Sequence, residues 1–127
     1  MRRTVPLILI CITVACAPKT RTIMLGTDRT PDTDPSDILV YSSKVPECPF
    51  EEIALVTAVQ GAFDYRGGLE AALDALKQKA HALGGHAIVG LEDRPKTKAE
   101  GPSLSGTVVR FTSDDCRPTP AGAPSRR

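Results

Sequence analysis

The chain has 127 residues, of which 41% are hydrophobic and only 4% aromatic, with no Trp. This length fits one domain, and the composition requires a core made of small and aliphatic side chains. The formal net charge is +1, and acidic and basic residues are mixed along the chain. Binding to nucleic acid requires Lys and Arg clustered on one face, so we expect no nucleic-acid partner.

The first fifteen residues have the pattern of an export signal. Met1-Arg2-Arg3 is a short positive segment, and an apolar run follows from Val5 to Ala15. That run is shorter than the roughly 20 residues that span a bilayer. Small residues then precede a break at Ala17-Pro18. The pattern predicts a cleaved secretory signal over residues 1–15; a buried N-terminal helix or strand is the alternative, disfavoured by the flanking Arg-Arg and the polar, Pro-rich stretch.

The end of this segment, Thr13-Val14-Ala15-Cys16, resembles the lipobox of bacterial lipoproteins. In that class the cysteine is diacylated and becomes the mature N-terminus. Thr13 departs from the pattern, which usually has Leu, Val or Ile there. The resemblance implies lipidation of Cys16 and attachment to the membrane through that lipid. Because Ala17 follows instead of Asp, it further implies the outer membrane, with the protein facing the periplasm.

The four cysteines fit this interpretation. Cys11 leaves with the signal and Cys16 takes lipid, so Cys48 and Cys116 remain. Export places these two in an oxidising compartment, and we predict an intramolecular disulfide between them. Two free thiols, or an intermolecular bond through Cys116, remain as alternatives. Sequence alone does not place the two Cα atoms within the roughly 7 Å that a disulfide requires.

Residues 16–37 are predicted to form a flexible tether between the lipid and a folded domain. The run TDRTPDTDPSD has little apolar surface to bury and many residues that favour turns. Ile23, Met24 and Leu25 interrupt this composition. Two alternatives are open for these three: packing on the domain, or a short edge strand.

The folded domain is predicted over residues 38–112, followed by a tail over 113–127. Four strands are predicted from β-branched, aromatic and alternating residues, at 38–42, 52–60, 87–91 and 106–112. One helix is predicted from Gly67-Gly68 to Leu83, ended by Gly84-Gly85. Its apolar stripe has three- and four-residue spacing and consists of Leu69, Ala72, Leu73, Leu76, Ala80 and Leu83.

This order, β-β-α-β-β, predicts an α+β fold in which one amphipathic helix packs on a four-stranded sheet. The strands on either side of the helix can run in the same direction through a right-handed crossover.

Two stretches of the domain resemble a known family. The first is Pro46-x-x-Pro49-Phe50-Glu51-Glu52-Ile53-Ala54-Leu55-Val56, and the second is Leu76-Lys77-x-Lys79-Ala80-x-x-Leu83-Gly84-Gly85-His86-Ala87-Ile88-Val89. Both are similar to patterns of small bacterial envelope proteins of the YbjQ-like and RcsF-like family. Gly85 stands where the family favours Ala, and His86 where it favours Asp or Asn. The resemblance implies the architecture of the domain rather than a signalling role.

The sequence has no arrangement typical of catalysis, so we expect a protein that is not an enzyme and needs no cofactor. Adjacent residues on a strand point to opposite faces, so Glu51 and Glu52 do not converge on a substrate. The two histidines, His81 and His86, are expected to be solvated at the surface. Together with Cys48 and Cys116 they lack the close spacing of metal ligands.

The function predicted from these observations is that of a lipid-anchored envelope protein. Its small domain would bind, sense or support another envelope component, such as a protein partner. The alternative is a metal- or small-ligand-binding module, oligomeric like its YbjQ-like relatives.

Overall fold

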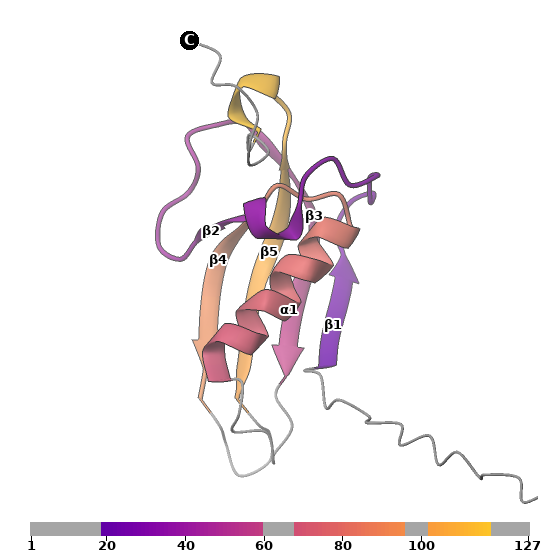
Figure 1. Ribbon diagram of the computed structural model, residues 1–127. Coiled ribbons are helices and arrows are strands. Elements are labelled where there is room, and N and C mark those ends of the chain that lie inside the picture. Colours follow the sequence, from indigo (N-terminus) through magenta and orange to yellow (C-terminus); the bar gives the residue numbers. More distant parts are fainter. Residues whose placement is uncertain (1–18, 60–67, 96–101, 118–127) are drawn as a thin grey trace, which may run out of the picture.

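The computed structural model describes residues 19–59, 68–95 and 102–117 (Figure 1). The predicted signal segment, Cys16 and the end of the predicted tail lie outside these residues. Within them, no helix is both long enough and apolar enough to cross a bilayer.

The fold is α+β, as predicted: one helix packs on a single mixed sheet (Figure 1). The sheet has five strands rather than four, in the order β1-β3-β5-β4-β2. Their bounds are Lys19–Met24 for β1, Leu39–Tyr41 for β2, Phe50–Val59 for β3, Ala87–Arg94 for β4 and Ser103–Phe111 for β5. The helix α1 spans Gly68–Ala82, and short 3-10 helices lie at Pro35–Asp37 (η1) and Asp114–Cys116 (η2).

The additional strand is β1, which pairs antiparallel with β3 from Lys19↔Val59 to Met24↔Ala54. It lies inside the range 16–37 that the composition assigned to a tether. The edge strand considered for residues 23–25 is therefore present and begins four residues earlier. Its sequence, KTRTIM, carries Lys, Arg and Thr on the exposed edge of the sheet, which are residue types that keep an edge strand from pairing with another chain.

The strands flanking α1 run in the same direction, because β3 and β4 are both antiparallel to β5. They are not neighbours, since β5 lies between them. The parallel pair in this sheet is β2 with β4, joined from Leu39↔Ala87 to Tyr41↔Val89.

The main core lies between α1 and the sheet. From α1 it takes Ala72, Leu76 and Ala80, which are buried as the stripe predicted. On β3 the register shifts between Glu52 and Ala54, so Ile53 and Ala54 are both buried at this irregularity. Leu69 departs from the prediction: it is 57% exposed and lines a pocket at the first turn of the helix.

A second, smaller cluster covers the other face of the sheet at the end where β5 finishes. Ala87, Val109 and Phe111 are buried there, with both domain cysteines packed against them. The predicted disulfide is present: Cys48 and Cys116 are bonded, with their Cα atoms 6.1 Å apart. Cys116 lies in η2, so residues 113–117 belong to the folded unit although the sequence placed them in the tail.

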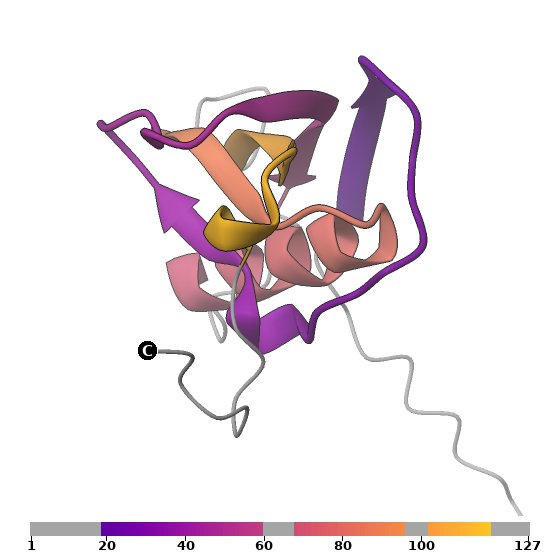
Figure 2. The same ribbon diagram turned by 90° about the horizontal axis from the view of Figure 1, so that it is seen from above.

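The segment that follows β1 turns around the end of α1 and leads to η1 (Figure 2). Its backbone is held to the helix end, where the Arg29 amide donates to the Leu83 carbonyl at 2.9 Å. The glycine stop permits this approach. Gly84 has a φ of +76°, and a Cβ there would collide with the Arg29 backbone. Gly84, one of the two glycines predicted to end the helix, therefore also provides the site on which this segment packs.

Candidate functional site

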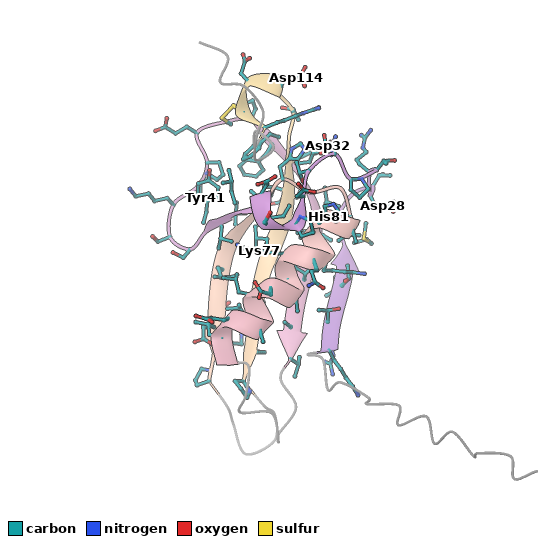
Figure 3. All side chains as sticks on the ribbon, viewed as in Figure 1. Asp28, Asp32, Tyr41, Lys77, His81 and Asp114 are labelled. Atoms are coloured by element: carbon teal, nitrogen blue, oxygen red, sulfur yellow. A yellow bond between two sulfur atoms is a disulfide. The ribbon has the colours of Figure 1, made fainter. Side chains whose placement is uncertain are left out.

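The main polar cluster of the described structure lies where the segment between β1 and η1 crosses the start of β4 and the end of β5. It consists of Asp32, His86, Arg110 and Arg117, and we call it the Asp32 cluster. Figure 3 labels Asp32 at this end of the domain, above the last turn of α1. Its members come from four separate parts of the chain, so the fold has to be complete before they meet.

His86 is at the centre of the cluster and is fully buried. Its amide donates to the Val109 carbonyl at 2.8 Å, and its carbonyl accepts from the Leu39 amide at 3.1 Å. The backbone is thereby fixed between β5 and β2. The ring stacks against Phe111, with centroids 6.0 Å apart. The expectation that both histidines are solvated is wrong for His86, because the strand that follows the glycine stop enters the sheet immediately.

The hydrogen bonds of the ring determine its tautomer. The Phe111 amide donates to His86 Nδ1 at 3.1 Å, so this nitrogen carries a lone pair. The proton of the neutral ring then sits on Nε2, which lies 2.8 Å from Asp32 Oδ1 and donates to it. Both ring nitrogens are therefore engaged.

The Asp32 carboxylate also accepts from two guanidinium groups. Oδ2 lies 3.0 Å from a terminal nitrogen of Arg110 and 3.5 Å from one of Arg117. Arg110 donates in addition to the carbonyl of Gly84, which lies just past the end of α1. One carboxylate thus joins the segment after β1 to the residue before β4, to β5 and to the residue after the disulfide.

Burial and charge shift two pKa values in this cluster. Desolvation lowers the pKa of His86 below 6.5 and is only partly offset by the hydrogen bond to Asp32. For Asp32, desolvation acts to raise the pKa, but the hydrogen bond from His86 and the charges of Arg110 and Arg117 outweigh it and leave the pKa below 3.8. At neutral pH the imidazole is therefore neutral and the carboxylate is ionised.

This arrangement favours structural positioning over catalysis. A histidine that acts as a general base needs a free nitrogen directed at the group it deprotonates. Here Nδ1 is occupied by the Phe111 amide and Nε2 by Asp32. The cluster instead fixes the segment around Asp32 to the folded sheet through charge-assisted hydrogen bonds, which are stronger than neutral ones.

The residues considered for a metal site do not come together as ligands. Cys48 and Cys116 are bonded to each other, so neither supplies a thiolate. His81 is half-buried on α1 (labelled in Figure 3), away from the disulfide. Within the described parts of the chain, no three His, Cys, Asp or Glu side chains are grouped to hold an ion.

The Asp32 cluster was not among the sites predicted from the sequence. One feature of the sequence pointed to this position: His86 directly follows the glycine stop, where the YbjQ-like and RcsF-like pattern that the sequence resembles favours Asp or Asn. Gly85 departs from the same pattern, and here a Cβ would collide with the Val108 side chain. Asp32 gave no signal, because it lies in a Pro- and Asp-rich run whose composition is typical of a solvated linker.

Comparisons with known proteins identify a similar fold. No family model matches the chain, and no curated protein matches it. Among solved structures, it is similar to the crystal structure of the Francisella virulence factor FvfA. The TM-score is 0.54 and the sequence identity 18%, over 71% of this chain and 95% of that one. At this identity, the likeness concerns the fold alone.

Proposed function

We propose that this protein is a lipid-anchored component of the bacterial outer membrane. Its periplasmic domain is a binding, sensing or structural module without catalytic activity. The observation that carries the proposal is the sequence Thr13-Val14-Ala15-Cys16, which ends an apolar run and precedes a disulfide-bonded domain. An export signal and a disulfide are independent features, and each indicates a protein that matures outside the cytosol.

The disulfide supports export for a chemical reason. Disulfides persist in the periplasm and outside the cell, whereas the cytosol keeps thiols reduced. The bond between Cys48 and Cys116 joins the loop before β3 to η2, and both sulfurs pack against the smaller core cluster. A fold that builds a disulfide into its packing fits a protein that matures outside the cytosol.

The surface of the sheet that α1 does not cover supports a binding role. On this face Ile23 and Leu55 lie directly opposite each other on β1 and β3. Both are exposed, at 61% and 36%. Neighbouring apolar side chains on a regular strand pair offer a protein partner a rigid, dry contact.

Metabolic labelling with a radioactive fatty acid tests the anchor. The wild-type protein should take up label and sediment with outer membranes, whereas Cys16→Ala should lose both properties. Cys11→Ala is the matched control and should behave as wild type. Label on the Cys16→Ala protein, or wild-type protein found only in the soluble fraction, would refute the proposal.

Site-specific photo-crosslinking tests the binding role in cells. A crosslinking amino acid at Leu55 should give one reproducible adduct. The same group at Gln78, exposed on α1, is the control and should give none. Equal adduct patterns from the two positions would show that the uncovered face of the sheet is not a specific contact surface.

A further inference from the structure

The distance between the lipidation site and the domain is fixed by covalent geometry. Cys16 precedes Lys19, the first residue of β1, by three residues. An extended chain advances at most about 3.6 Å per residue, so Cys16 and Lys19 are at most about 11 Å apart. A lipid on Cys16 would therefore hold the start of β1 against the bilayer rather than at the end of a long tether.

The start of β1 identifies one end of the domain. Lys19 pairs with Val59 at the end of β3, and Val59 pairs with Ser103 at the start of β5. Ser103 in turn pairs with Arg94 at the end of β4. The first turn of α1 lies at the same end, opposite η2 (Figure 1). We call this the β1-start end.

Among the described residues, the β1-start end carries exposed apolar surface. Leu69, in the first turn of α1, is 57% exposed. It borders a pocket of about 160 Å³, whose other lining residues are Ala72, Asp93, Pro102, Ser103 and Leu104. The apolar stripe of the helix thus extends beyond the core and is exposed at this end.

We propose that the domain docks on the bilayer through its β1-start end, with Leu69 and the adjoining pocket against the lipid. This inference rests on the proposed lipidation of Cys16. The anchor raises the local concentration of this end at the membrane, and burying an exposed Leu in an apolar environment is favourable. The Asp32 cluster and the disulfide then face away from the membrane, toward periplasmic partners.

The absence of Trp from the sequence provides a clean test. Leu69→Trp and Asp115→Trp each place a single indole fluorophore, at the β1-start end and in η2 at the opposite end. Each mature, lipidated protein, beginning at Cys16, is purified from membranes and reconstituted into phosphatidylcholine vesicles with or without bromine on the acyl chains. Bromine quenches indole fluorescence only at short range. The Leu69→Trp protein should therefore lose its fluorescence in brominated vesicles, and the Asp115→Trp protein should retain it.

The possible outcomes distinguish an error in the docking orientation from an error in the proposed lipid anchor. If the protein floats with the vesicles but Leu69→Trp is not quenched, or both variants are quenched equally, the docking orientation is wrong and the anchor stands. If the purified protein carries no lipid on Cys16 and does not float, both fail. Quenching of Leu69→Trp alone supports both.

Discussion

Replacing Cys48 and Cys116 together by Ala should lower the free energy of unfolding by about 4 kcal/mol. The two residues are 68 apart in sequence. In the chain-entropy description, closing a loop of that size removes about 15 cal/mol/K from the unfolded ensemble, or about 4 kcal/mol at 25 °C. Because small domains are stable by only about 5–15 kcal/mol, this loss is a large fraction of the total.

Urea unfolding of residues 17–127, which contain no other cysteine, measures this effect. The oxidised wild type should unfold at a clearly higher urea concentration than the double Ala variant. Reductant should move the wild type close to the variant and leave the variant unchanged. A single urea midpoint for the two proteins under oxidising conditions, or an equal shift of both by reductant, would show that the disulfide does not supply this stability.

Further substitutions and a change of pH test the packing and the polar cluster. Leu76→Ala should lower the free energy of unfolding by about 2–5 kcal/mol because this side chain is fully buried. Leu69→Ala should change it by less than about 0.5 kcal/mol because that side chain is largely exposed. Equal melting temperatures for the two variants would contradict the helix packing. Asp32→Ala should cost about 1–3 kcal/mol, measured by urea unfolding, because it leaves the buried Nε2–H of His86 without its acceptor; an unchanged midpoint would show that the cluster does not hold the segment. The stability of the wild type should also fall as the pH drops below 6.5, because the unfolded chain then protonates His86 while the folded state, with its lowered pKa, does not. Asp32, whose pKa is also lowered, adds a further loss only below about pH 3.8. Urea midpoints measured from pH 7.5 to pH 4 check the histidine effect, and constant or rising stability toward acid pH would contradict it.

The elements of the domain could be predicted from the sequence where one local pattern determines them. The helix follows from its three- and four-residue spacing, and its end from Gly84, whose positive φ suits glycine. The strand at 19–24 is harder, because KTRTIM has only two large apolar residues and forms through pairing with β3. Leu69 fits the apolar period equally well but is 57% exposed in the first turn of α1, which the period alone does not indicate.

The candidate site could be predicted only in part, because it depends on contacts distant in sequence. Cys48 and Cys116 could be paired by counting cysteines after assigning Cys16 to lipid. The bond between His86 and Asp32 joins residues 54 apart. Arg110 reaches the same carboxylate across 78 residues. No periodicity or spacing relates these positions, so their proximity follows from the folded topology and not from local sequence.

The most direct test of the lipid anchor is the intact mass of the protein purified from bacterial membranes. The proposal predicts a chain that begins at Cys16, carries fatty acyl groups on that residue, and is two hydrogens lighter than its reduced form because of the single disulfide. A chain that retains residues 1–15, or one with an unmodified N-terminus whose membrane association is the same in Cys16→Ala, would contradict it.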